Sequence, residues 1–254
     1  MCGFFCIIGK NQNKLISNSE IISTGKKYLH RGPDSQKFYF DDEFKCYFRR
    51  LSIIDLNERS DQPFQSDNKR FIILFNGEIY NFKILKKELL DLSHKFKTQG
   101  DTEVIIKAFQ EWGKNFVKKI QGMFSICIWD KKFKKLYAFR DRFGIKPLYY
   151  TFYKNTYIFS SEIKDILVLS KTKKIQENPK MIIDYLANGS LNDTEQTFFK
   201  NIKSVKPGHI IEITNNNFKA EKYWSLNYSE SLSLNQTEII KNFNKNLKMH
   251  TISD

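Results

Sequence analysis

The chain opens with the nine residues Met1-Cys2-Gly3-Phe4-Phe5-Cys6-Ile7-Ile8-Gly9. The apolar run after Cys2 predicts a short strand that is buried on both faces. Removal of Met1 would leave Cys2 with a thiol and a free α-amine in one residue. The ordinary pKa is about 8.5 for a cysteine thiol and about 7.7–8.0 for an α-amine, so the amine can accept the thiol proton near neutral pH without a histidine. A buried structural cysteine is the ordinary alternative.

Three later segments supply the side chains that free glutamine would need in a binding site. Arg50 carries a planar guanidinium, which can hold an α-carboxylate through two hydrogen bonds. Glu78 and Asp101 carry carboxylates that can pair with an α-ammonium. Attack on the side-chain amide of glutamine creates an oxyanion, and the amide of Asn76 with the backbone N–H of Gly77 can stabilise it.

Each of these residues also has an ordinary structural role. An Asn-Gly pair between apolar runs is a hairpin signal, so Asn76-Gly77 is predicted to turn the chain as well as to bind an oxyanion. Asp101 begins a predicted amphipathic helix over residues 101–113, where an aspartate commonly caps the first turn. Glu78 could be an exposed charge beside the hairpin. The residues alone leave these roles open beside substrate binding.

The order and spacing of the motifs resemble those of the glutamine-hydrolysing asparagine synthetases, whose N-terminal domain is a class II glutamine amidotransferase. The similarity extends over the first two-thirds of the chain. The motifs that carry it are Met1-Cys2-Gly3, Arg31-Gly32-Pro33-Asp34, Arg50-Leu51-Ser52-Ile53, Gln62-Pro63, Phe75-Asn76-Gly77-Glu78-Ile79-Tyr80-Asn81, Gly122-Met123-Phe124, Arg140-Asp141-Arg142-Phe143-Gly144-Ile145-Lys146-Pro147-Leu148-Tyr149-Tyr150 and Ser160-Ser161-Glu162-Ile163-Lys164.

The resemblance implies an α+β fold of the N-terminal-nucleophile hydrolase type, which is a four-layer αββα sandwich of two antiparallel sheets flanked by helices. It implies that Cys2 is the nucleophile and that Asn76 and Gly77 complete the catalytic set. It also implies that Arg31, on the turn after a helix over residues 18–30, supports the nucleophile without a catalytic step. The substrate-binding set that it implies is Arg50, Leu51, Ser52, Ile53, Ile54, Asn76, Gly77, Glu78 and Asp101.

The C-terminal part of the chain predicts a second unit. From about Asn227 the composition becomes rich in Ser, Asn and Leu, which is typical of a linker. Residues 237–249 then predict a helix with one apolar stripe. We therefore expect a glutaminase domain over residues 1–226. Over residues 227–254 we expect a linker and the first helix of a truncated asparagine synthetase domain.

We do not expect these residues to form the binding sites of a synthetase reaction. Asparagine synthetases carry a Ser-Gly-Gly-x-Asp-Ser loop for ATP shortly after a Ser-Asp pair, and this chain has the pair Ser253-Asp254 but no Ser-Gly-Gly. We expect no cofactor in this chain, with ATP and Mg²⁺ bound by a synthetase domain or partner chain that also binds the acceptor. A homodimer is compatible with the sequence. No metal site is expected, since the spacing of Cys2, Cys6, Cys46 and Cys127 lacks the Cys-x-x-Cys pattern.

Composition narrows the remaining function classes. Lys and Arg number 42 against 28 Asp and Glu, and the formal net charge of +14 would by itself suggest a nucleic-acid partner. The lysines are scattered at positions typical of a solvated surface, so no nucleic-acid partner is expected. No apolar run approaches about 20 residues and no signal peptide precedes Cys2, so we expect no membrane insertion and no secretion. Reduced thiols indicate the cytoplasm.

The sequence thus predicts hydrolysis of glutamine to glutamate and ammonia by Cys2, as the ammonia-donating half of an asparagine synthase. Three alternatives stay open. The same half could serve another carboxylate acceptor, such as a sugar acid in surface-polysaccharide synthesis. The chain could be a catalytically silent fragment of the same fold. It could also be a basic nucleic-acid-binding protein, which would bind with strong salt dependence.

Overall fold

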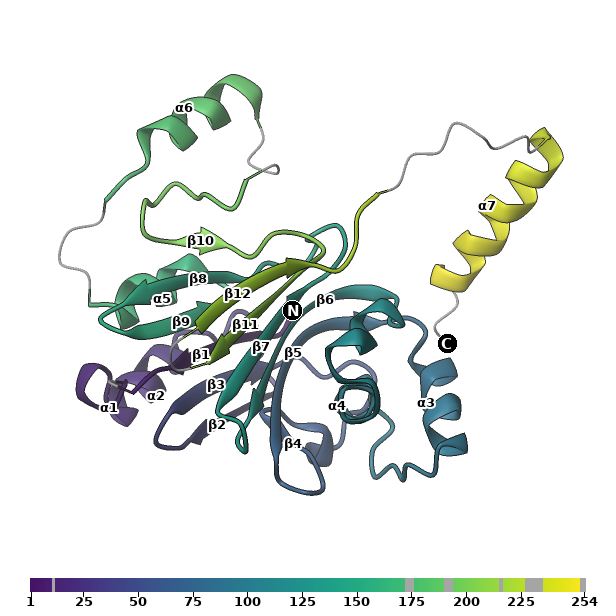
Figure 1. The fold of residues 1–254 in the computed structure, drawn as a ribbon, viewed down its shortest axis with the longest axis horizontal. Coiled ribbons are helices and arrows are strands. Elements are labelled where there is room, and N and C mark those ends of the chain that lie inside the picture. The colour runs from purple at the N-terminus through teal and green to yellow at the C-terminus, as the bar shows by residue number, and fades with distance from the viewer. Residues whose placement is uncertain (11, 172–175, 190–193, 215–216, 227–234, 252–254) are drawn as a thin grey trace.

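The computed structural model describes residues 1–10, 12–171, 176–189, 194–214, 217–226 and 235–251 (Figure 1). Within these described residues, twelve strands form two six-stranded sheets, and every strand pairing within the sheets is antiparallel. Figure 1 shows the helices α1, α2 and α5 on one side of the paired sheets and α3 and α4 on the other. This arrangement confirms the predicted αββα sandwich.

The first sheet has the strand order β10-β8-β9-β1-β3-β2. Its central strand β1 pairs with β3 on one side and with β9 on the other, so the residue after the amino-terminal Met-Cys enters the middle of the sheet. The strand bounds are β1 Gly3–Ile8, β2 Ser35–Phe40, β3 Phe44–Arg50, β8 Tyr149–Tyr153, β9 Thr156–Ser160 and β10 Lys203–Ser204.

The second sheet has the strand order β12-β11-β7-β6-β5-β4. Its longest strands, β5 and β6, pair along their whole lengths, from Phe71 opposite Asp130 to Ile79 opposite Gly122. The strand bounds are β4 Phe64–Gln65, β5 Phe71–Ile79, β6 Gly122–Asp130, β7 Lys135–Arg140, β11 His209–Thr214 and β12 Asn217–Lys222.

The core between the two sheets is built from alternate residues of their central strands. Phe4, Cys6 and Ile8 of β1 face this core, while Phe5 and Ile7 of the same strand face the helices on the outer side. The strand is therefore buried on both faces, as its continuous apolar run predicts. Phe44 stacks on Trp129 across the core, with 5.2 Å between ring centroids.

Three cysteines lie in the same inter-sheet core and are buried. Cys6 is the register partner of Cys46, and Cys127 packs in the same cluster from the second sheet. Each thiol behaves as a small apolar side chain that fills the space between the sheets. Among the residues that the structure describes, no group of three or more His, Cys, Asp and Glu side chains is arranged to hold a metal ion.

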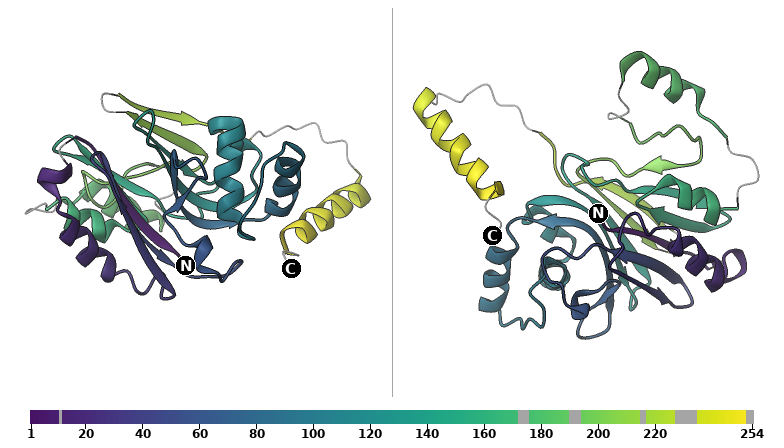
Figure 2. Two further views of the ribbon diagram at one scale, coloured as in Figure 1. Left: turned by 90° about the horizontal axis from the view of Figure 1, so that it is seen from below. Right: turned by 180° about the vertical axis from the view of Figure 1, so that it is seen from behind.

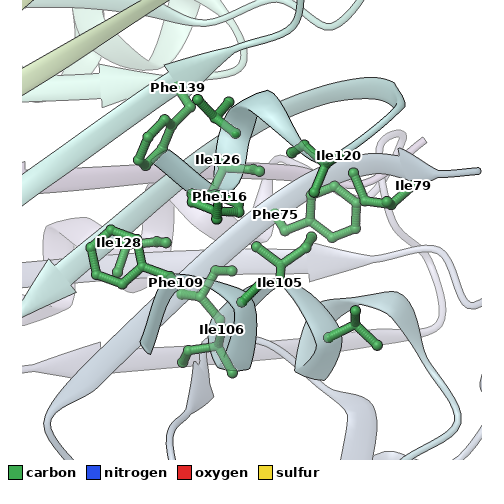
Figure 3. Close-up of a cluster of buried hydrophobic side chains, with 14 of the residues drawn as sticks. Phe75, Ile79, Ile105, Ile106, Phe109, Phe116, Ile120, Ile126, Ile128 and Phe139 are labelled. Carbon is green, nitrogen blue, oxygen red and sulfur yellow. The ribbon is translucent and has the colours of Figure 1, made fainter. Parts of the chain in front are cut away.

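Helices cover the outer face of each sheet. On the second sheet, Phe109 of α4 meets Phe139 edge-on at 6.4 Å between centroids. Ile105 of the same helix lies in the same cluster, near Phe75, as Figure 3 shows. Phe116 meets Phe139 edge-on at 5.1 Å between centroids. The helix bounds are α1 Gln12–Leu15, α2 Asn18–Lys26, α3 Phe82–Asp91, α4 Asp101–Trp112 and α5 Ile163–Leu169, with 3-10 turns η1 Glu58–Ser60 and η2 Gly113–Lys118.

Two more helices stand away from the sandwich in Figures 1 and 2. They are α6, Pro179–Asn188, and α7, Gln236–Thr251. The predicted helix near the C-terminus is confirmed, and Ile239, Ile240 and Phe243 on its apolar stripe are exposed. The predicted linker falls mostly on residues 227–234, outside the described residues, and the domain boundary stays a prediction. None of the described helices is both long and apolar enough to cross a membrane.

The predicted hairpin turn at Asn76-Gly77 is wrong. Both residues lie inside β5, where Asn76 pairs with Ser125 and Gly77 with Phe124 of β6. The turn preference of an Asn-Gly pair is local, and here long-range pairing with β6 outweighs it. A Cβ atom on Gly77 would collide with the backbone oxygen of Met123, so glycine is needed for the close approach of the two strands.

A test of the packing concerns Gly25 in α2. In an open helix, glycine to alanine stabilises by about 1 kcal/mol. Here a Cβ would overlap the buried ring of Tyr47, and overpacking costs roughly 1–3 kcal/mol. We expect Gly25→Ala to lower the urea midpoint of unfolding, whereas Ser23→Ala on the exposed face of the same helix should leave it nearly unchanged. A midpoint raised by Gly25→Ala would contradict this packing.

Candidate active site

A pocket of about 110 Å³ lies beside Cys2 and draws its walls from both sheets and from α4. Nine of the ten residues predicted for the site line it: Cys2, Arg50, Leu51, Ile53, Ile54, Asn76, Gly77, Glu78 and Asp101. The tenth, Ser52, does not line the pocket, and its backbone N–H donates to Asp34 Oδ2 at 2.7 Å. The fold therefore brings together residues that lie up to 99 positions apart in the sequence.

The Cys2 thiol lies against the end of β3. The backbone N–H of Leu51 donates to Cys2 Sγ at 3.3 Å, and the thiol lies 3.5 Å from the carbonyl oxygen of Leu51. Burial raises the pKa of the Cys2 thiol, and the Leu51 N–H, the amino terminus and Arg50 offset only part of that rise. A thiol in this environment needs a neighbouring base to become a thiolate near neutral pH.

Asn76 presents a buried donor to the pocket. Its side chain is 1% exposed, and its Nδ2 has no hydrogen-bond partner among the described residues. An unsatisfied buried donor costs about 1–3 kcal/mol. Such a group in the wall of a pocket beside a thiol is arranged to donate to a ligand atom.

Gln62 holds the strand segment that leads to Asn76. Its Nε2 donates to the carbonyl oxygen of Phe75 at 3.0 Å, and its Oε1 accepts the Phe75 N–H at 2.6 Å. Strand β4 pairs with Ile72 and Ile73, so the Gln62 side chain continues that pairing by one further rung. The sequence marked Gln62-Pro63 as part of a motif but indicated no role for it.

Arg50 is buried and is already held by protein groups. Its Nη1 donates to Asp61 Oδ1 at 2.8 Å and to the carbonyl oxygen of Asn57 at 3.1 Å, and its Nη2 donates to the carbonyl oxygen of Asp55. A guanidinium has five N–H donors, so two remain, enough for one bidentate contact. Burial alone would raise the pKa of Asp61, but the bonds from Arg50 and Ser35 hold that pKa below its ordinary value.

Asp101 is the first residue of α4, one position after the N-cap residue Gly100. Its carboxylate accepts the backbone N–H of Ile79 at Oδ2 at 3.2 Å, and backbone N–H groups of the first helical turn, those of Asp101 itself and Thr102, also lower its pKa. Burial raises the pKa of Asp101 to about 7, and the negative charge of Glu78 adds to the rise. The site thus holds a carboxyl group that makes no ion pair with any Lys, Arg or His side chain in the described part of the chain.

Arg31 and Lys146 approach the amino terminus. Arg31 Nε pairs with Glu162 at 2.9 Å, and a Cβ on Gly3 would lie 2.9 Å from Arg31 Cβ. Arg31 therefore packs against the residue that follows Cys2, and its support of the nucleophile stays a prediction. Lys146 was missed as a site residue, although the motif of residues 140–150 contains it. It lines the pocket, is 8% exposed, and has no carboxylate within 4 Å among the described residues.

Comparisons with known proteins agree with this geometry. The family model of the glutamine amidotransferase domain matches residues 1–224. The chain is 43% identical over 202 residues to asparagine synthetase [glutamine-hydrolyzing] 2 of Bacillus subtilis (strain 168), covering 78% of this chain and 27% of that protein. It is 33% identical over 207 residues to the amidase chry2 of Gibberella zeae, covering 80% of this chain and 30% of that protein. The chain therefore spans less than a third of the length of either relative.

A solved structure shares the fold. The glutamine phosphoribosylpyrophosphate amidotransferase from B. subtilis aligns with a TM-score of 0.65 at 19% identity, covering 89% of this chain and 50% of that chain. At this identity the likeness shows the fold alone.

The raised pKa of Asp101 predicts a stability cost at neutral pH. Its folded pKa of about 7 lies above the unfolded value of 3.8, so stability falls as pH rises between these values and stays low above pH 7. We expect Asp101→Asn to stabilise the protein by roughly 1–4 kcal/mol at about pH 8 and by much less at about pH 4, measured by urea unfolding. Asp91→Asn on the exposed end of α3 is the control. Equal gains at both pH values would contradict the buried, cation-free carboxyl.

Proposed function

The chain belongs to the glutamine amidotransferase domain family, and from this premise we propose that it hydrolyses glutamine to glutamate and ammonia with Cys2 as the nucleophile. One observation supports the proposal most. The pocket that contains the Cys2 thiol also contains an unpartnered amide donor, Asn76, and opposite charges at Arg50 and Asp101. These are the groups that an attack on the amide of an α-amino acid requires.

The first step is removal of the thiol proton. In the structure Met1 precedes Cys2, so the Cys2 nitrogen is a peptide nitrogen and is not basic. Removal of Met1 creates an α-amine on the same residue as the thiol. This amine takes the proton, and the thiolate sulfur attacks the carboxamide carbon of glutamine.

The second step is collapse of the tetrahedral intermediate. The oxyanion accepts hydrogen bonds from Asn76 Nδ2 and the Gly77 N–H. The Cys2 ammonium returns its proton to the leaving nitrogen, so the carbon–nitrogen bond breaks and ammonia leaves a thioester on Cys2. Water, deprotonated by the same amine, then attacks the thioester carbon and forms a second oxyanion. The carbon–sulfur bond breaks, glutamate leaves, and the Cys2 ammonium returns its proton to the sulfur.

The head group of glutamine, which is its α-carboxylate and α-ammonium, binds in the part of the pocket that Arg50 and Asp101 line. The two free N–H groups of Arg50 receive the α-carboxylate as a bidentate pair. The α-ammonium approaches Asp101 and Glu78, and its positive charge lowers the pKa of Asp101 from the value of about 7 that burial and Glu78 produce. Backbone groups of Leu51, Ile53 and Ile54 border the same space.

The ammonia acceptor lies outside these residues. We propose that a synthetase domain or partner chain, binding ATP and Mg²⁺, uses the ammonia to make asparagine from aspartate. The similarity to an asparagine synthetase of which this chain spans 27% supports this role. The similarity to a protein named as an amidase favours a second candidate, in which another carboxylate is amidated. A reducing cytoplasm suits a mechanism that needs a free thiol.

Replacement of the nucleophile is the direct test of the proposal. We expect Cys2→Ala to abolish glutamate release from glutamine, because no other described cysteine lines the pocket. Cys127→Ala, which removes a thiol from the inter-sheet core, should retain most of the activity in the same coupled glutamate assay. Turnover by Cys2→Ala at the wild-type rate would rule out the assignment.

Removal of the oxyanion donor should separate activity from stability. We expect Asn76→Ala to lower kcat by about 10²–10³-fold, as the loss of one such donor does elsewhere. Because Nδ2 has no partner in the described part of the fold, the same change should not lower the melting temperature much. Asn68→Ala, in the turn before β5, is the matched control with normal kcat. A large loss of stability without a loss of kcat would show that Asn76 is structural.

A further inference from the structure

Asp55 lies between the two charged ends of the proposed head-group site. It is buried and lines the pocket, but its carboxylate is taken up by protein donors and so is not free for substrate. We propose that Asp55 is a positioning residue that fixes the separation of Arg50 and Asp101, and so selects substrates with both an α-carboxylate and an α-ammonium. This inference rests on the proposed glutamine hydrolysis.

On one side, Asp55 holds Arg50. The backbone carbonyl oxygen of Asp55 accepts a hydrogen bond from Arg50 Nη2. In the same segment, the carbonyl oxygen of Asn57 accepts a hydrogen bond from Arg50 Nη1, and the N–H of Asn57 donates to Asp55 Oδ1 at 3.0 Å. The carboxylate of Asp55 therefore shapes the loop whose carbonyl groups orient the guanidinium.

On the other side, Asp55 holds the segment that carries Asp101. Asp55 Oδ2 accepts the backbone N–H of Gln99 at 2.9 Å and the Ser60 hydroxyl at 2.7 Å. Gly100 packs directly on this pair, since a Cβ there would lie 3.6 Å from Asp55 Cβ and 3.7 Å from Ser60 Oγ. Asp101 follows directly after Gly100, so the bonds of Asp55 fix the backbone that leads into it.

The charge of Asp55 is what makes these bonds possible together. Burial alone would raise its pKa, but hydrogen bonds from Gln99, Ser60 and Asn57 hold that pKa below its ordinary value, so the group is ionised at neutral pH. A carboxylate accepts at both oxygens. An asparagine would place an NH₂ group against one of these N–H donors and would break at least one of the links.

The experiment compares Asp55→Asn with wild type on two substrates. Glutamine carries the full head group, and glutaramate (5-amino-5-oxopentanoate) has the same amide and carboxylate but lacks the α-amine. We expect Asp55→Asn to raise KM for glutamine about tenfold to a hundredfold with kcat within about threefold of wild type. The ratio of kcat/KM values for glutamine over glutaramate should fall about tenfold.

A second readout separates recognition of the head group from reactivity of the Cys2 thiol. Iodoacetamide alkylates the thiol but has no α-carboxylate or α-ammonium, whereas 6-diazo-5-oxo-norleucine carries both. In Asp55→Asn we expect the iodoacetamide rate to stay within about twofold of wild type and the diazo-oxo-norleucine rate to fall about tenfold. Asp42→Asn, an exposed aspartate in the turn between β2 and β3, should leave both rates and both KM values unchanged.

Ser60→Ala removes one of the bonds to Asp55 Oδ2 and keeps the test decisive where Asp55→Asn does not fold. It should shift the same ratio in the same direction by a smaller factor. An unchanged ratio, or an equal loss with iodoacetamide, would overturn the inference. Wild-type protein without glutaminase activity would instead overturn the proposed function, so the two failures are distinguishable.

Discussion

The position of Cys2 depends on the burial of the first strand. Strand β1 lies in the middle of its sheet, with side chains packed between the sheets on one face and under helices on the other. The chain therefore cannot move its amino terminus without disturbing two apolar cores. Gly3 continues this constraint, since a Cβ there would lie 2.7 Å from the ring of Tyr28. A nucleophile at the end of such a strand is fixed to the end of β3 through Leu51.

Around this fixed point, a layer of polar side chains replaces regular strand pairing at one end of the sandwich. Gln62 pairs with the backbone of Phe75, and Arg50 is held by Asp61 and two loop carbonyls. Buried polar groups whose hydrogen bonds are all made keep this region rigid, whereas each buried polar group without a partner lowers the free energy of unfolding. Two exceptions line the pocket: in the described part of the chain, Asn76 Nδ2 has no hydrogen-bond partner and Asp101 makes no ion pair. Both groups lie in one pocket. Glutamine can supply both partners, an oxygen of its side-chain amide for Asn76 and its α-ammonium for Asp101.

The sequence allowed the fold and most of the site to be predicted because these parts depend on local pattern and on recognisable motifs. The apolar run of β1 and the helical periodicity of α3 and α4 are local signals, and they agree with the structure. The hairpin expected at residues 76–77 failed because pairing with β6 residues 49 and 47 positions later decides that backbone. Asp55 and Gln62 were missed because their partners lie 44 and 13 positions away, and no periodicity encodes such contacts. Lys146 was missed because a buried charge is visible only from its surroundings.

The central claim is that Cys2, freed of Met1, forms a thioester with the glutamyl group. The most direct measurement is mass spectrometry of the amino-terminal peptide after the protein is mixed with glutamine and quenched in acid within the first turnovers. The account predicts a peptide that begins at Cys2 and carries one glutamyl group. Active protein that retains Met1, or a glutamyl group on Cys6, Cys46 or Cys127 and not on Cys2, would contradict it.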